Sequence, residues 1–496
     1  MTAPAQPTVR SPWLAFAAVV SMQLMMVLDI SIVTVALRSI QEDLGFSQPR
    51  IAWVTTAYTL GFGGFLLLSG RLGDLFGKKR MFLTGMTVFL VASLFCGLSR
   101  NQDMLIAARF VQGAGAAMGF AVAMGIVFSL FRDPRESGKA MGGLGFVQAA
   151  GASVGIVAGG ALTSGISWHW VFFLNLPIGI VAAVLVFRLV PNDRGAGFGD
   201  GADILGAVLV TVGMMLGVYT IATVGDEGWG SGHTIGYGLA SLALLGGFVA
   251  RQATAANPLM RLDVFRSRNL SGANLVHLFL VAGMISGNIL IALYMQQVLG
   301  YSAATTGFAF LPIALSAAAV SLGFSARFNM RFGPKNVLLV SLVVVAASLL
   351  LAVRGPVDAT YVVDVLPTAL LLGVGTGLAL PAVMTLAMAV SSPRDIGLAS
   401  GLVGTSGMVG DSLGIAVMTA VAAAHTKSEL ADGKPVLTAL NDGYHLAFGL
   451  AAAVVVVGLV IGFAMLKPLP PMPHPGGGEP PTEAQPAPAG AEAGRA

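Results

Sequence analysis

Charge is scarce in this 496-residue sequence. Asp, Glu, Lys and Arg make up only 10% of the residues, whereas a soluble domain carries about 25%. Hydrophobic residues reach 55% and the mean hydropathy is +0.82. A water-soluble fold cannot bury this much apolar surface. The composition therefore excludes a soluble protein and predicts an all-α polytopic membrane protein.

Cysteine is nearly absent as well. The single Cys96 lies in an apolar run, which excludes an intramolecular disulfide. The basic residues are scattered between hydrophobic runs, so the sequence pI near 9.3 does not indicate nucleic-acid binding. We find no HExxH metal helix, Walker loop or GxSxG elbow, which argues against an enzyme. We expect no catalytic residue, metal or bound cofactor.

Long apolar runs dominate the sequence instead. Runs of about 18 to 25 residues are typical of transmembrane helices. Fourteen of them lie near residues 13–37, 51–69, 81–99, 104–129, 139–163, 170–190, 203–224, 234–251, 270–295, 304–326, 335–353, 361–388, 396–422 and 443–466. The first run is too long for a signal peptide and lacks a convincing cleavage site, so we expect it to be retained.

The basic residues predict the orientation. With the N-terminus cytoplasmic, 20 of the 27 Lys and Arg residues fall on the inner side, 6 fall on the outer side and Arg109 lies within a span. Both termini are therefore predicted to be cytoplasmic. The tail at 467–496 is rich in Pro, Gly, Ala and Glu and is predicted to be disordered.

Two loops form an internal repeat. GRLGDLFGKKR (70–80) follows the second predicted span, and ARFNMRFGPKN (326–336) follows the tenth. Aligning Gly77 with Gly333 also aligns an Arg, a Phe and a Lys of each loop. Repeated halves are typical of transporters.

The repeat predicts five parts of the chain. These are an N-terminal tail (1–12), a six-helix bundle (13–190), a linker with two additional helices (191–269), a second six-helix bundle (270–466) and the C-terminal tail (467–496).

The motifs resemble those of the major facilitator superfamily and, within it, the fourteen-span drug:proton antiporter family. The resemblance covers residues 13 to 466 and is strongest in the loop 70–80. The other motifs are LDISIVTVAL (28–37), RFVQGAGAAMG (109–119), GASVGIVAGGAL (151–162), WHWVFFLNLPIG (168–179) and NPLMRLDVFRSRNL (257–270). The resemblance implies two six-helix bundles plus two extra helices, proton coupling, a monomer and a bacterial cytoplasmic membrane.

The loop 70–80 is a candidate cytoplasmic gate. Its glycines allow close backbone approach, and its charges can pair across neighbouring helix ends and latch one conformation. The alternative is a simple positive-inside anchor, which explains neither the glycines nor the acid. The gating residues are Gly70, Arg71, Gly73, Asp74, Gly77, Lys78, Lys79 and Arg80.

Two carboxylates lie deep inside predicted spans. Asp29 and Asp411 are each some fifteen residues from the cytoplasmic end of a run, roughly 20 Å into the bilayer. Such acids are costly and mark ion pathways. We interpret Asp29 as a proton-coupling group, Arg109 as a cation that responds to its protonation, and Asp411 as a second proton site or a counter-charge for cationic substrates. The alternatives are a neutral, hydrogen-bonded acid at Asp29 or a static ion pair.

Four glycines in the predicted fifth span form an antiporter motif by resemblance. Gly151, Gly155 and Gly159 recur every four residues, with Gly160 beside them, and small residues at this spacing allow tight helix packing. We expect packing between spans five and eleven to seal the central route. Plain packing is the alternative.

Polar and adaptable side chains are candidates for substrate binding. Asn274, His277 and Asn288 share a face of the ninth span, where His277 could also take part in proton transfer and interhelical hydrogen bonding is the alternative. Lipid or core packing is the alternative for the Met and aromatic residues. The other candidate pocket residues are Gln112, Tyr58, Met25 and Tyr294.

The sequence therefore predicts a proton-coupled multidrug exporter that moves lipophilic, cationic small molecules out of the cell by alternating access. Its partners would be the substrate, protons and the lipid bilayer, with the proton gradient as its energy source and no cofactor. A dedicated exporter of one metabolite, antibiotic, lipid or siderophore remains open on the same fold, as do uniport and sodium coupling. A membrane enzyme or a channel is disfavoured.

Overall fold

The computed structural model describes residues 11–131, 134–193, 195, 197, 203–255, 258, 262–389 and 396–469. Every regular element among these residues is a helix, and twelve helices are long and apolar enough to cross a membrane. Two more, α3 (Trp53–Phe76) and α6 (Pro134–Gly165), have 24 and 32 residues, which also suffices for a ~30 Å hydrocarbon core. The predicted all-α polytopic fold is confirmed.

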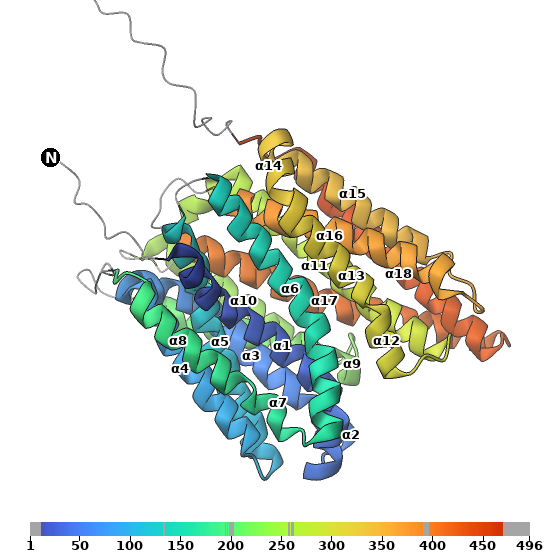
Figure 1. Cartoon of the computed structure of the whole chain (residues 1–496). Helices are drawn as coiled ribbons and strands as arrows, with labels where there is room; N and C mark the ends of the chain where they lie inside the picture. The colour runs from blue at the N-terminus through green and yellow to red at the C-terminus, as the bar shows by residue number, and fades with distance from the viewer. Residues whose placement is uncertain are drawn as a thin grey trace, which may run out of the picture.

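The first six spans form one group, blue to green in Figure 1. In chain order they are α1 (Pro12–Leu44), α3, α4 (Lys78–Gly97), α5 (Gln102–Leu130), α6 and the pair α7 (His169–Phe173) and α8 (Asn175–Leu189), with the short α2 (Gln48–Ile51) after α1. Within this group α5 packs extensively against α3 and α4, and α1 packs against α6 and α8.

The last six spans form a second group, yellow to red in Figure 1. They are α11 (Arg268–Gln297); α12 (Ala303–Ala309), α13 (Leu311–Val320), η2 (Ser321–Ser325) and α14 (Ala326–Phe332) in succession; α15 (Pro334–Ala352); η3 (Tyr361–Val365) with α16 (Leu366–Ala387); α17 (Ile396–Ala431); and α18 (Val436–Met465). Here α11 packs against both α17 and α18, and α15 packs against α16.

Two additional helices connect the groups. α9 (Ile204–Glu227) and α10 (Gly232–Thr254) pack on each other and are followed by the short η1 (Leu262–Arg266). α9 also contacts both α3 and α17. A Cβ on Gly64 of α3 would lie 2.4 Å from Met215, so the absent side chain lets α9 approach α3 closely. The inserted hairpin is thus part of the helical body.

Glycines bring α3 and α5 into backbone contact. A Cβ on Gly61 would lie 2.1 Å from the Phe110 carbonyl oxygen, and one on Gly113 would lie 2.0 Å from that of Tyr58. Any larger residue would push the helices apart. This contact holds the polar side chains of α5, including Arg109, against α3 and α1.

The two groups meet through α17 and α6. Gly404 of α17 faces Leu66 and Phe120, and Gly401 faces Leu67. These partners lie on the second half of α3 and on α5, so the contact is near the loop 70–80. α6 packs against α13, η2 and α14. The side of the molecule that carries the loop 70–80 is therefore the side on which α3 and α17 are closed together.

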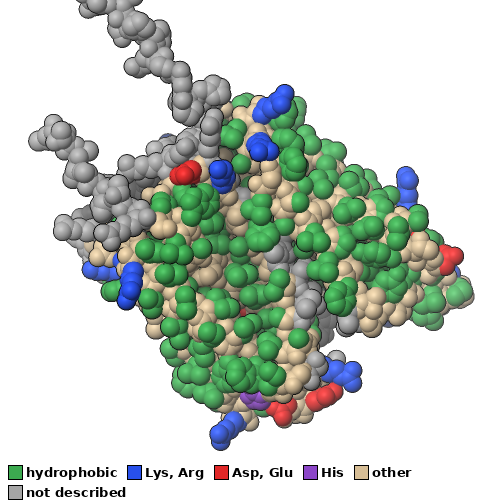
Figure 2. All heavy atoms as spheres, in the orientation of Figure 1, with side chains coloured by type: hydrophobic (Ala, Val, Ile, Leu, Met, Phe, Trp, Pro, Cys, Tyr) green, Lys and Arg blue, Asp and Glu red, His purple; other side chains and the backbone are tan. Residues whose placement is uncertain are grey.

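The surface has the pattern of a membrane protein. Hydrophobic side chains cover the broad face in Figure 2, while Lys and Arg lie near the ends of the helices. The most exposed include Phe463 at 75% and Ile204 at 72%, values that fit contact with lipid rather than water. The predicted tails, 1–12 and 467–496, lie outside the described residues except for 11–12 and 467–469.

Candidate functional site

Asp29 and Arg109 form a buried ion pair at the centre of the first helix group. Nη1 of Arg109 donates to Oδ2 of Asp29, and each residue is only 1% exposed. α1 carries the acid and α5 carries the base. The structure thus brings together the two charged residues that the sequence places inside spans one and four.

Amide side chains complete the hydrogen bonding of this carboxylate. Gln112 Nε2 donates to Asp29 Oδ1 at 2.9 Å, and Asn175 Nδ2 lies 3.3 Å from the same oxygen. Both amides also donate to Ser93 Oγ, at 3.3 and 3.0 Å. Four helices, α1, α4, α5 and α8, therefore meet in one polar network, because each contributes at least one of these buried side chains. We call Asp29, Arg109, Gln112, Asn175 and Ser93 the polar core.

The guanidinium of Arg109 also contacts a backbone carbonyl and two aromatic rings, which carry no charge. Its Nε donates to the Val54 carbonyl at 2.9 Å, and its Cζ lies 4.4 Å from the ring centre of Tyr58 and 5.8 Å from that of Phe172. Aromatic rings stabilise a cation weakly compared with a carboxylate. If Asp29 became neutral, Arg109 would keep only neutral partners, and a buried cation without its counter-ion is strongly destabilising.

Sequence reasoning missed Asn175, Ser93 and the Tyr58 contact with Arg109. Asn175 lies within the quoted motif WHWVFFLNLPIG, at the first position of α8, and this was the available signal. Tyr58, expected in a substrate pocket, is 3% exposed and lies beside Arg109. Met25, expected there too, is fully buried in the hydrophobic core.

The second helix group contains a neutral polar cluster. His277 Nδ1 lies 3.1 Å from Ser406 Oγ, and this hydroxyl lies 3.2 Å from Asn274 Oδ1. The cluster ties α11 to α17, and His277 is 6% exposed. Asn274 and His277 therefore do share a site, as their common helix face predicts.

Asn288 and Tyr294 are not part of that cluster. Asn288 lies 11 residues beyond His277, roughly 16 Å along the helix. Tyr294 donates to the Pro356 carbonyl at 2.6 Å, in the loop after α15. The structure therefore does not gather Tyr294 with Tyr58 or Met25, which belong to the first group.

Asp411 occupies the middle of α17. Its side chain is half-buried, and its buried Oδ1 has no hydrogen-bond partner among the described residues. Gly404, seven residues earlier, faces Leu66 and Phe120. Because residues seven apart point in nearly the same direction, Asp411 faces the first helix group beyond the point where α17 contacts α3.

The loop 70–80 is held by the segment after α8. The carboxylate of Asp193 accepts from the Lys78 N–H at 2.5 Å and the Lys79 N–H at 3.1 Å, and so caps the N-terminus of α4. Gly77 has a φ of 99°, and a Cβ there would lie 2.8 Å from the Asp193 carbonyl oxygen. This conformation and the close contact explain the need for glycine.

The other gating residues take different places. Gly73 packs on Val122 of α5, and the Lys79 ammonium donates to the Phe187 carbonyl at 2.8 Å. Gly70 is buried, Arg71 and Asp74 lie in the last two turns of α3, and Arg80 is exposed in the first turn of α4. Fixing this loop to α5 and α8 gives it a defined position next to the α3–α17 contact.

The glycine face of α6 packs on α1. A Cβ on Gly151 would meet Val27 at 3.1 Å, one on Gly155 would meet Ser31 at 2.7 Å, and one on Gly159 would meet the Ile32 backbone at 3.0 Å. The expected partner, span eleven, is therefore wrong for this face. α1 is the neighbour because the face points into its own helix group. A Cβ on Gly160 would meet none of the described residues within 4 Å.

Comparisons with known proteins agree with this architecture. A family model described as Major Facilitator Superfamily matches residues 19–270 and 275–493. Puromycin resistance protein pur8 of Streptomyces alboniger is 34% identical over 92% of this chain and 91% of its own length. Cephamycin export protein CmcT of Amycolatopsis lactamdurans is 35% identical over 82% and 84%.

A solved structure, the human organic anion transporter MFSD10 (TETRAN), matches the fold. Its TM-score is 0.66 at 14% identity, covering 92% of this chain and all of that one.

Proposed function

This chain belongs to the major facilitator superfamily, and we propose that it is a proton-coupled exporter of lipophilic small molecules that works by alternating access. The polar core carries the proposal. An ion pair buried in a membrane protein is expensive to keep, and intramembrane acids and bases commonly serve transport. We assign proton coupling to Asp29 and the response to its protonation to Arg109.

The contacts suggest how a proton would act. In the described conformation Asp29 accepts from Arg109, Gln112 and Asn175, so every nearby group stabilises the carboxylate. A proton on Asp29 would remove the counter-charge of Arg109 and turn one carboxylate oxygen into a donor facing N–H donors. The four helices would then favour a different packing in which Asp29 reaches water. Protonation and helix arrangement are linked in this way.

The gate is proposed at the loop 70–80. The α3–α17 contact closes the molecule on that side, and Asp193 with Lys79 anchors the loop to the first helix group. Basic residues near these helix ends favour a cytoplasmic position. The described conformation then corresponds to a transporter closed toward the cytoplasm. The protein would lie in a bacterial cytoplasmic membrane with both termini on the cytoplasmic side.

The cargo is proposed to be a lipophilic cation or a natural product of similar size. Asp411 supports a cationic group, because its buried Oδ1 has no hydrogen-bond partner among the described residues and its position seven residues after Gly404 turns it toward the first helix group. The relatives that are named for resistance to puromycin and export of cephamycin support an antibiotic-like cargo. We propose no cofactor, with the proton gradient as the energy source and a monomer as the working unit.

Whole cells lacking their own drug pumps provide a direct test. Cells that produce the chain should accumulate less ethidium and less puromycin than cells with the empty vector, and an uncoupler of the proton gradient should restore accumulation. Asp411→Asn should weaken ethidium export more than export of an uncharged compound. Unchanged accumulation of a broad compound panel, with the protein present in the membrane, would contradict export of this class.

A dedicated exporter is the second candidate. It is favoured by relatives that are each named after one antibiotic, among them a tetracenomycin C resistance and export protein of Streptomyces glaucescens. The same accumulation assay separates the two, since a dedicated exporter would protect cells from one structural class only, whereas a multidrug exporter would act on chemically unrelated lipophilic compounds.

A further inference from the structure

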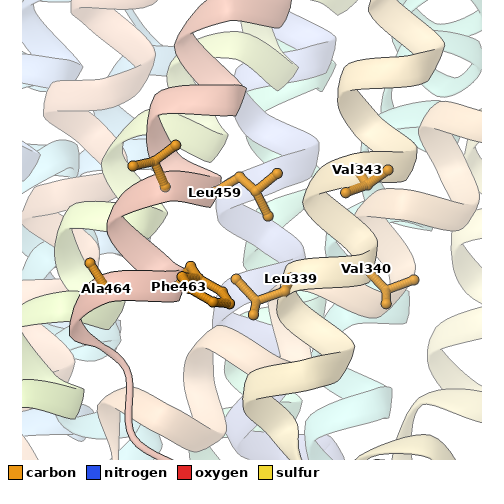
Figure 3. Close-up of a pocket in the computed structure, with 7 residues that line it drawn as sticks. Leu339, Val340, Val343, Leu459, Phe463 and Ala464 are labelled. Carbon is orange, nitrogen blue, oxygen red and sulfur yellow. The ribbon is translucent and has the colours of Figure 1, made fainter.

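An apolar groove lies on the outer surface between α15 and α18. Leu339, Val340 and Val343 of α15 face Leu459, Phe463 and Ala464 of α18 across it (Figure 3). Val460 completes the lining, so every lining side chain is a hydrocarbon. Val340, Val460 and Phe463 are 58%, 63% and 75% exposed. The groove therefore opens toward the membrane rather than toward the interior of the transporter.

A cation lies at one end of this groove. Lys335 is four residues before Leu339 and eight before Val343, so the three share one face of α15 over about 12 Å. Its ammonium lies 5.7 Å from the ring centre of Phe463, which lines the groove. The apolar stripe thus ends in a positive charge where α15 begins.

The ammonium of Lys335 is held in place and has bonding capacity left. It donates to the Leu466 carbonyl at 2.5 Å and lies 3.4 Å from that of Phe463, at the end of α18. A lysine ammonium has three N–H donors, so one has no partner among the described residues and can serve an anion. The first N–H groups of α15 lack partners within the helix and add positive potential there.

The equivalent position in the first half of the internal repeat, at the start of α4, binds a carboxylate. In the first half, Lys79 donates to the Phe187 carbonyl and lies 5.3 Å from the Phe187 ring, the same arrangement as Lys335 with Phe463. There the Asp193 carboxylate binds the N-terminus of α4. Lys335 bonds no carboxylate in the part of the chain that the structure describes. The second half offers the anion site without a matching carboxylate among the residues that the structure describes.

We propose that the α15–α18 groove binds one anionic phospholipid in the leaflet on the side of the loop 70–80. An acyl chain lies in the apolar groove, and the headgroup phosphate accepts from Lys335. The occupant is a lipid because the lining is entirely hydrocarbon and faces the bilayer. It is an anionic lipid because the ammonium of Lys335 is fixed at the headgroup end. The site is separate from the polar core and does not depend on the transported substrate.

Native mass spectrometry of the full chain in detergent tests this, using an equal mixture of phosphatidylglycerol and phosphatidylcholine of the same acyl chains. The wild type should retain one phosphatidylglycerol with about fivefold preference, the effect expected of one basic residue at an anionic headgroup. Lys335→Gln should lose the preference, and Lys335→Arg should keep it. Lys434→Gln, which removes a lysine on the other side, is the matched control and should keep it.

A second variant tests the groove itself. Ala464→Trp fills the groove from an exposed position and leaves Lys335 and its carbonyl partners unchanged, so it should lose the retained lipid without losing the charge. Equal retention of both lipids by the wild type would overturn the proposal. So would unchanged phosphatidylglycerol retention in Lys335→Gln or Ala464→Trp. Displacement of the lipid by millimolar glycerol phosphate alone would show a headgroup site without a groove, and would overturn it too.

Discussion

The two helix groups bury polar side chains in different ways. The first encloses a charged pair, Asp29 and Arg109, whose carboxylate also receives amide donors from Gln112 of α5 and Asn175 of α8. The second joins α11 to α17 through the neutral contact of His277 with Ser406, and within the described part of the chain the Oδ1 of Asp411 has no hydrogen-bond partner. The two helix groups therefore differ in their buried polar groups: the first contains the charged pair, and the second contains the neutral cluster and the Oδ1 of Asp411. We interpret the first group as the site of proton coupling and the second as the half with a carboxylate free to meet cargo.

Removing the cation of the polar core should have the largest effect. Arg109→Ala leaves Asp29 buried without its counter-ion, and breaking a buried pair typically costs about 3–5 kcal/mol. We expect a sharp fall in melting temperature in detergent. The double variant Asp29→Asn with Arg109→Gln removes both charges and should recover most of this stability while remaining uncoupled. A double variant as unstable as Arg109→Ala would show that the pair is not the source of the loss.

The glycine contact between α1 and α6 should come next. Gly155→Leu places a side chain where a Cβ alone would lie 2.7 Å from Ser31. Overpacking of this kind costs about 1–3 kcal/mol, and it should move α1, hence Asp29, and lower transport. Gly160→Ala is the control, because its Cβ would meet no part of the described structure within 4 Å. If both variants lost transport and melting temperature equally, Gly155 would not be the contact that positions α1 against α6.

The neutral cluster of the second group should matter less. His277→Ala removes the contact with Ser406, which is worth about 1 kcal/mol, and we expect a small fall in melting temperature with proton coupling retained. Ser406→Ala should behave alike. Loss of substrate-dependent proton flux in His277→Ala, but not in Ser406→Ala, would place a proton relay in the second group and remove the division between the halves.

The additional hairpin should show the smallest effect. Burial opposes ionisation of Asp203, but the Gly206 N–H, Gln252 and Arg251 hold the pKa of its carboxyl below the ordinary value. A depressed pKa means that this carboxylate stabilises the fold above the ordinary carboxyl pKa, and that the contribution is lost as pH falls through the folded value. Asp203→Asn should lower the melting temperature slightly at pH 7 and abolish this part of the acid sensitivity. Unchanged acid sensitivity in Asp203→Asn would contradict the stabilising role of the Asp203 carboxylate.

Much of the architecture could be predicted from the sequence, because bilayer-spanning helices need long apolar runs. Asp29 and Arg109 stood out for the same reason, as charges within such runs. Asn175 and Ser93 did not, since small polar residues are common near helix ends and only the packing of four helices gives them a shared partner. Asp193 lies in a linker, so nothing in its spacing relates it to Lys78. The neighbour of the α6 glycine face depends on helix arrangement, which periodicity does not specify.

The central claim is that Asp29 couples protons to cargo, and purified protein in liposomes tests it most directly. Vesicles loaded with a pH-sensitive dye and given a proton gradient are mixed with ethidium. Wild type and Asp411→Asn are compared with Asp29→Asn, whose amide can still accept from Arg109. The account predicts ethidium-dependent proton movement in the wild type and its loss in Asp29→Asn. Undiminished proton movement in Asp29→Asn, in protein that melts as a folded species, would contradict it.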